Sequence, residues 1–133
     1  MARILVVDDL PEVARSIARM LCNHETSMET DPRLAVSRMV DGERFDVVLV
    51  DYNMPDMSGR EVSDALSNAH LERPPIVLIM SGGENVESLF ATGRAVLIKP
   101  FDGDELRDLV SAMLRDAAAH TRTSRDSRNS RPS

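Results

Sequence analysis

Residues 47–51, VVLVD, form a run of four apolar residues that ends in an aspartate. Runs of this length, rich in valine and isoleucine, are typical of strands that are covered on both faces, as in a parallel sheet. A polar run, TSMET at 26–30, fits a strand at the edge of such a sheet. Three further runs have the same apolar character: ILVV at 4–7, IVLIM at 76–80 and AVLI at 95–98.

A segment with helical periodicity follows each of these runs. Ser58 and Glu61 form a capping pattern before one apolar stripe, and Asp102 and Glu105 repeat it before the clearest stripe in the chain. The segment at 85–92 is the poorest and predicts a shortened fourth helix of about two turns. Strand and helix alternate five times, which predicts an α/β fold with an open, doubly wound, five-stranded parallel sheet.

Length and charge predict one domain with a tail. The chain has 133 residues, of which 42% are hydrophobic and 29% charged. No domain boundary is evident within 1–116, whereas 117–133 carries four arginines against one aspartate, a net charge of +3 in a chain of net charge −6. This basic tail ends in a stretch without apolar residues and is predicted to be disordered. The acidic body, with no tryptophan and four other aromatic residues, argues against direct nucleic-acid binding.

The sequence predicts a cytoplasmic protein that does not associate with membranes. The first apolar run, at 4–7, is too short for a signal peptide or a membrane span. Cys22 is the only cysteine, so no disulfide can form within the chain.

Polar side chains that carry chemistry follow the ends of the apolar runs. Ligands of an open parallel sheet bind outside the carboxyl ends of its strands, so these side chains are expected to converge on one rim. Three carboxylates at close quarters repel one another unless a cation joins them, and hard oxygen ligands suit Mg²⁺. The acid at the end of the central strand is the natural nucleophile, and a hydroxyl can donate to a phosphoryl oxygen. The converging residues are Asp8, Asp9, Asp51, Ser81 and Lys99.

Lys99 is the only lysine in a chain with fifteen arginines. A compact ammonium acts as a point charge on one oxygen, whereas the guanidinium fork demands bidentate geometry and more space. Chance placement of the lysine is the alternative. Asp8 and Asp9 could likewise be helix caps beside Pro11, and Asp51 a turn aspartate. Neither helix capping nor a role in a turn explains why the three aspartates all fall at the same end of the sheet.

Four blocks of the sequence, taken together and in this order, resemble the signatures of response-regulator receiver domains of two-component signalling. The resemblance covers 3–116 and implies the flavodoxin-like strand order 2-1-3-4-5. It implies that Asp51 accepts a phosphoryl group from a histidine kinase or a phosphotransfer protein. The chain would then act by docking a downstream protein or by relaying the group, as a stoichiometric acceptor rather than an enzyme. The blocks are ILVVDD, VVLVDYNMPDMSG, IVLIMSG and VLIKPF.

The resemblance also implies a role for each site residue. Asp9 and Asp51 would bind Mg²⁺ directly, Asp8 would bind it through water, and the main-chain carbonyl of Asn53 would complete the site. The phosphoryl oxygens would be held by two further residues, Ser81 and Lys99. A cis peptide bond is expected between Lys99 and Pro100.

Two features depart from the family pattern. Val96 stands where these domains usually carry an aromatic switch residue, and the fourth helix is short. The resemblance therefore does not extend to the usual serine–aromatic output mechanism. The sequence predicts no second domain, so the expected output is docking to another protein, as a monomer or a weak dimer.

Three other functions are alternatives for this sequence. A haloacid-dehalogenase-type phosphatase would place its nucleophile on the first strand and a second acid two residues later, where this chain has Asn53. A flavodoxin-like binder of a small ligand would need a phosphate-cradling loop after the first strand, where this chain has the acidic sequence DDLPE. A degenerate receiver would bind proteins without phosphorylation, although every chemical position is present here.

Overall fold

The predicted runs form one parallel sheet in the computed structural model, which describes residues 1–83 and 85–130, with the side chains of α5 described as far as Ala118. The order of the strands is β2-β1-β3-β4-β5, which confirms the predicted topology. The polar strand β2 lies at one edge, and β3, which ends in the aspartate, lies at the centre. The strands are β1 (Arg3–Val7), β2 (Glu25–Glu29), β3 (Val47–Asp51), β4 (Ile76–Ser81) and β5 (Ala95–Ile98).

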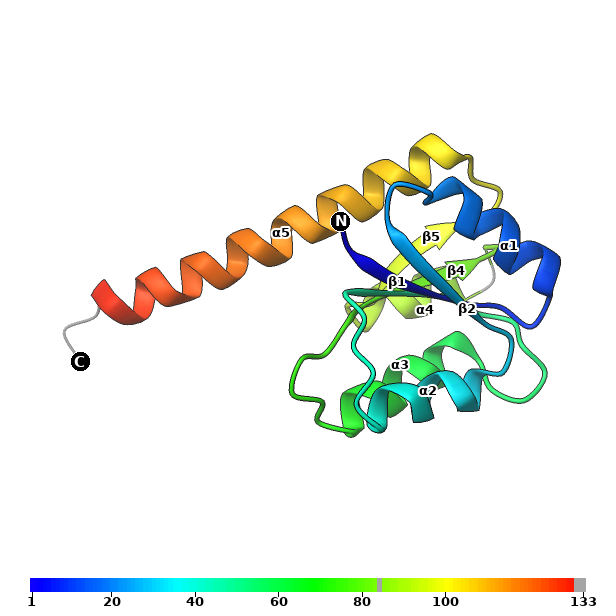
Figure 1. The fold of residues 1–133 in the computed structure, drawn as a ribbon, viewed down its shortest axis with the longest axis horizontal. Coiled ribbons are helices and arrows are strands. Elements are labelled where there is room, and N and C mark those ends of the chain that lie inside the picture. Colours follow the sequence, from blue (N-terminus) through cyan, green and yellow to red (C-terminus); the bar gives the residue numbers. More distant parts are fainter. Residues whose placement is uncertain (84, 131–133) are drawn as a thin grey trace.

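Helices cover both faces of the sheet (Figure 1). One core cluster joins α1 and α5 to alternate residues of the strands, and a second cluster joins α2, α3 and α4 to the other set. All five residues of β3 are buried, as its unbroken apolar pattern predicts. No helix in the described part of the chain is both long and apolar enough to cross a membrane. The helices are α1 (Pro11–Met20), α2 (Pro32–Val40), α3 (Gly59–Asn68), α4 (Val86–Ala91) and α5 (Gly103–Ser130).

Two predicted helix starts are present. The Ser58 hydroxyl accepts from the Glu61 N–H, and the Glu61 carboxylate accepts from the Ser58 N–H, so a complete capping box begins α3. The Asp102 carboxylate accepts from the Glu105 N–H at the start of α5. The fourth helix is six residues long, in agreement with the predicted shortening.

The helix α5 reaches into the predicted tail. The backbone of α5 continues as helix through Ser130 and extends away from the body (Figure 1), and the disorder expected from residue 117 stays a prediction. The alanines at 117–119 are strong helix formers, and they carry the helix past the point where apolar periodicity ends. The last part of the predicted tail, 131–133, lies outside the described residues.

Candidate functional site

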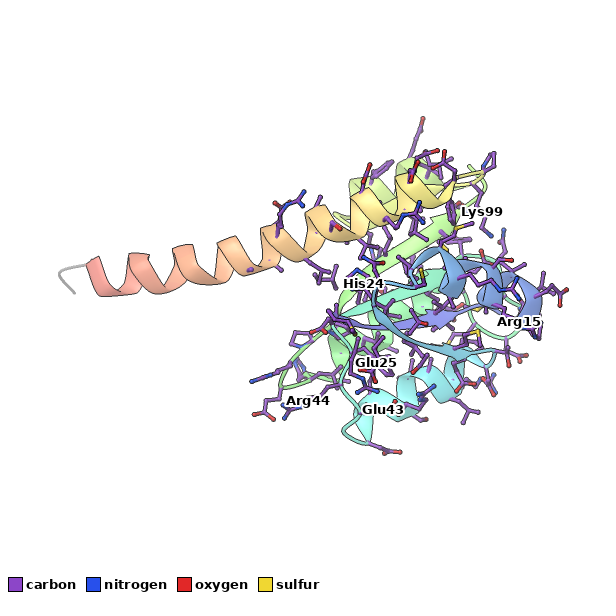
Figure 2. The ribbon with its side chains drawn as sticks, turned by 45° about the horizontal axis from the view of Figure 1, so that its top comes forward. Arg15, His24, Glu25, Glu43, Arg44 and Lys99 are labelled. Carbon is purple, nitrogen blue, oxygen red and sulfur yellow. The ribbon has the colours of Figure 1, made fainter. Side chains whose placement is uncertain are left out.

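The predicted site residues lie at the carboxyl end of the sheet. Strand register places Asp8, which follows β1, level with Asp51 at the end of β3. Ser81 lies one residue further along β4, and Lys99 directly follows β5. Figure 2 shows Lys99 at this end, close to the start of α5. The parallel strands thus bring together residues that are far apart in the sequence, such as Asp8 and Lys99, which are separated by 91 positions.

Asp8, Asp9 and Asp51 form a carboxylate cluster. One oxygen from each lies within 4.8 Å of the others. Asp8 Oδ1 accepts from the Leu10 N–H at 3.0 Å, whereas Asp8 Oδ2 is buried and has no hydrogen-bond partner in the described part of the chain. Leu10 is the N-cap of α1 and no side chain caps it, so helix capping does not account for the aspartates. A buried carboxylate oxygen without a donor, beside two more carboxylates, fits a divalent cation.

Burial raises the pKa of the Asp8 carboxyl above its ordinary value. The nearby charges of Asp51 and Asp9 raise this pKa further, while the Leu10 N–H and the Lys99 ammonium oppose them. Burial is the largest cause of the raised pKa and the neighbouring carboxylates add to it, in a site where Asp8 is 1% exposed and Asp51 is 6% exposed. Without a cation, ionisation of Asp8 therefore costs folding free energy.

Lys99 forms an ion pair with Asp51. Its ammonium donates to Asp51 Oδ1, and the side chain of Lys99 is about one-third exposed while that of Asp51 is nearly buried. The Lys99 N–H also donates to the Ser81 carbonyl at 2.7 Å, which fixes the backbone that carries the ammonium. The peptide bond between Lys99 and Pro100 is cis, as expected. The lone lysine is thus directed at the proposed nucleophile.

The loop after β3 is held against the site by its backbone. The Tyr52 N–H donates to the Met80 carbonyl at 2.8 Å, and the Gly59 N–H donates to the Tyr52 carbonyl at 3.0 Å. Asn53 lies in this loop, two residues after Asp51, with an exposed side chain. These bonds hold the start of the loop that carries the Asn53 carbonyl, which is a predicted metal ligand.

Gly59 has a positioning role that the spacing of the carboxylates does not predict. A Cβ at this position would lie 2.8 Å from the main-chain oxygen of Asp51, closer than real contacts allow. Only glycine lets α3 begin directly against the backbone of the acidic residue. The available signal in the sequence is a glycine placed immediately after the capping Ser58.

Ser81 is buried at the end of β4. Its hydroxyl accepts from the Gly83 N–H at 3.4 Å. The next residue, Gly82, is exposed, and a Cβ there would meet no atom within 4 Å. The rim is therefore open beside the hydroxyl, and a ligand can approach from this side.

The departures from the family pattern lie next to the site. Val96 is half-buried and packs against the cluster that contains α4. The neighbouring Arg94 forms an ion pair with Asp64 of α3, and its N–H donates to the Leu89 carbonyl of α4 at 3.1 Å. The corner between α4 and β5 is therefore tied to α3 by an arginine, with a stiff valine in place of an aromatic residue.

Asp8→Asn is expected to raise the melting temperature of the metal-free protein by about 3 °C at pH 7. The amide removes one charge from the cluster and keeps an oxygen for the Leu10 N–H. Because the pKa of Asp8 is raised in the folded state, wild type loses stability as pH rises from near the ordinary value of 3.8. The gap between variant and wild type should therefore widen with pH.

Thermal melts in EDTA between pH 4 and 8 would check this expectation, with Asp56→Asn, an exposed aspartate in the loop after β3, as the matched control. A variant that is less stable than wild type at every pH would mean that the cluster is not under charge strain.

Comparison with known proteins identifies the family. The model of the response regulator receiver domain matches residues 4–111. The cell cycle response regulator CtrA of Brucella ovis is 30% identical over 129 residues, which cover 91% of this chain and 53% of CtrA. The chain thus spans about half the length of the curated relatives it matches.

Solved structures agree on the fold. The chemotaxis protein CheY4 of Vibrio cholerae has a TM-score of 0.70 and 27% identity, over 84% of this chain and 98% of CheY4. The response regulator TrrA of Thermotoga maritima, in complex with Mg²⁺ and BeF, has a TM-score of 0.73 and 25% identity, over 84% of this chain and 98% of TrrA. With the sheet order and the four sequence blocks, these matches show that the chain belongs to the response regulator receiver domain family of two-component signal transduction.

Proposed function

We propose that this chain is a phosphoaccepting switch that takes a phosphoryl group onto Asp51 from the phosphohistidine of a histidine kinase or a phosphotransfer protein. One observation carries the proposal: the acid at the end of the central strand is paired with the only lysine of the chain, beside two further carboxylates. Membership of the receiver family supports it. The nearly buried acid is held on a rigid strand, which favours a single direction of attack.

The transfer is a displacement at phosphorus. An oxygen of the Asp51 carboxylate attacks the phosphorus atom, an O–P bond forms, and the P–N bond to the donor imidazole breaks. The electron pair stays on the ring nitrogen, which takes up a proton from solvent. Asp51 is consumed in each transfer, so the chain is a stoichiometric acceptor and not an enzyme. At most, it promotes its own phosphorylation from small donors and its own dephosphorylation.

Mg²⁺ fits the carboxylate cluster. Asp8, Asp9 and Asp51 would hold it, together with the main-chain carbonyl of Asn53, and the unpartnered Asp8 Oδ2 supplies an oxygen that lacks any other donor among the described residues. When bound, the ion would neutralise the carboxylates and the oxygens of an incoming phosphoryl group. The likeness to TrrA, which is described in complex with Mg²⁺, supports the same ion here.

Lys99 and Ser81 would hold the transferred group. The Lys99 ammonium already contacts a carboxylate oxygen of Asp51. It is therefore placed to contact an oxygen of a phosphoryl group that is bonded to this carboxylate. The Ser81 hydroxyl lies at the same rim, beside the open space over Gly82. Both groups donate hydrogen bonds, so they stabilise negative charge on the phosphoryl oxygens.

The proposed output is docking of a downstream protein or onward transfer of the phosphoryl group, by a monomer or a weak dimer in the cytoplasm. Val96 is β-branched and lacks the reach of an aromatic lever, so a response at the short helix α4 is proposed in place of a side-chain flip. The packing of α4 supports this, since only Leu89 of its described residues is fully buried.

Incubation with acetyl phosphate and Mg²⁺ should add one phosphoryl group to the intact protein. The reaction should stop when EDTA removes the metal, because the carboxylate cluster then repels the anionic donor. Intact-protein mass spectrometry measures the adduct directly. Absence of an adduct under all conditions would favour the degenerate receiver, which binds partners without phosphorylation. Equal adducts with and without EDTA would contradict the metal site.

A further inference from the structure

The amino end of the sheet carries a groove that has no part in the proposed phosphoryl chemistry. It has a volume of about 610 Å³. It lies between α5, at Leu114 to Ala118, and the two loops that precede β3 and β4. Arg44 and Lys99 lie at opposite ends of the body (Figure 2), so this groove is remote from Asp51. Its walls are partly apolar and its charged residues are mostly basic, whereas the carboxylate cluster is acidic.

The groove is basic within an acidic chain. Its charged lining consists of three arginines and one aspartate, whereas the chain as a whole has a net charge of −6. The aspartate, Asp46, is engaged, because its carboxylate accepts from the Arg3 N–H at 2.8 Å. By sequence, the part of α5 beyond Ala118 contains three more arginines and one aspartate.

Two of the three arginines are available to a partner. Arg3 is held, since it donates to the Arg44 carbonyl at 2.7 Å and stacks on Phe45. The side chain of Arg44 is 58% exposed and pairs at 3.5 Å with Glu72, which is 85% exposed. An ion pair in so much solvent contributes little and exchanges readily. Arg73 is exposed, and no carboxylate of the described residues pairs with it.

The same groove has an apolar wall. Leu114 and Ala118 of α5 line it together with Phe45. A smaller adjoining hollow of about 290 Å³ shares Arg44, Phe45 and Arg73, so these residues stand between the two. α5 leaves the body at this point (Figure 1), and its side chains Leu114 and Ala118 therefore offer an apolar strip beside two available guanidinium groups.

We propose that this groove, which we call the α5 groove, docks an acidic amphipathic helix of a partner protein. A helix laid along α5 would bury apolar side chains against Leu114 and Ala118 and bring its acidic side chains to Arg44 and Arg73. Charge complementarity selects an acidic partner. A second copy of the chain would bring the same basic lining to the contact and no acidic complement to it, and the apolar wall does not suit nucleic acid.

A synthetic probe tests the proposal with the full chain. The probe is a fluorescein-labelled peptide of about 18 residues, with leucines at helical spacing and glutamates at the other positions. Its twin carries glutamine in place of each glutamate. Fluorescence anisotropy at about 50 mM salt should give affinity at least tenfold higher for the acidic peptide than for the twin.

Variants locate the binding. Arg44→Glu with Arg73→Glu, and separately Ala118→Asp, should each weaken binding of the acidic peptide by about tenfold, while Arg73→Lys keeps most of it. The matched control is Arg15→Glu, an exposed arginine on α1 that is distant from Arg44 in Figure 2 and should leave binding unchanged. Thermal melts confirm that each variant is folded, and the substituted side chains are all exposed.

Four results would overturn the proposal. They are equal binding of the twin, an equal loss in Arg15→Glu, displacement of the peptide by duplex DNA that binds more tightly through the same arginines, and a dimer in light scattering that the Ala118→Asp variant abolishes. The second result would indicate non-specific charge attraction, and the last would assign the α5 groove to a second copy of the chain.

Discussion

Asp51→Asn is expected to lose phosphoryl uptake by at least about 100-fold while the protein stays folded. The amide has nearly the same shape as the carboxylate and can still accept from the Lys99 ammonium, but it is not a nucleophile. Asp51 lies at the end of a strand in which all five residues are buried, so an isosteric change should leave the packing intact. A loss of phosphoryl uptake would therefore reflect the missing nucleophile and not unfolding of the protein.

The measurement is intact-protein mass spectrometry after treatment with acetyl phosphate and Mg²⁺, with Asp56→Asn as the control. Asp56 is an exposed aspartate in the loop after β3. It should not be phosphorylated in the wild-type protein or in Asp51→Asn. Uptake by Asp51→Asn at the level of wild type would mean that another carboxylate is the acceptor.

Lys99→Arg is expected to weaken binding of beryllofluoride, a mimic of the phosphoryl group, by about tenfold although the positive charge is kept. The ammonium contacts one oxygen of a nearly buried carboxylate, and Lys99 N–H is fixed to the Ser81 carbonyl. A guanidinium is wider and needs two acceptors in its own plane. The site offers space for a point charge, so arginine should either displace the mimic or leave Asp51 unpaired.

Isothermal titration of the Mg²⁺-loaded protein with beryllofluoride would measure the change. Arg15→Lys is the control, because it makes the reverse substitution at an exposed position of α1. If Lys99→Arg binds the mimic as tightly as wild type does, charge alone matters at this position and the single lysine is there by chance.

The strands were predictable because burial on both faces leaves an unbroken apolar pattern, as in β3. The convergence of Asp8, Asp51 and Lys99 was predictable for a related reason, since parallel strands carry their carboxyl ends to one edge. The unpartnered Oδ2 of Asp8 was not predictable, because it depends on the Leu10 N–H donating to Oδ1 of the same carboxylate.

Two other features do not follow from the apolar pattern. The helical backbone of α5 past 117 is one, because alanines favour helix where apolar periodicity has ended, and the disorder of 117–133 stays a prediction. The α5 groove joins side chains from separate loops and from α5, and their adjacency follows from the crossover geometry of the sheet rather than from any local motif.

Chemical trapping can identify the residue that carries the phosphoryl group, which is proposed to be Asp51. Borohydride reduces an aspartyl phosphate to homoserine, so it marks the acceptor permanently, and peptide mapping by mass spectrometry then identifies the residue. After treatment with acetyl phosphate and Mg²⁺, we expect homoserine at position 51 of the wild-type chain and at no other aspartate. Homoserine at Asp8 or Asp9, or an unmodified Asp51 in protein that has gained a phosphoryl group, would contradict it.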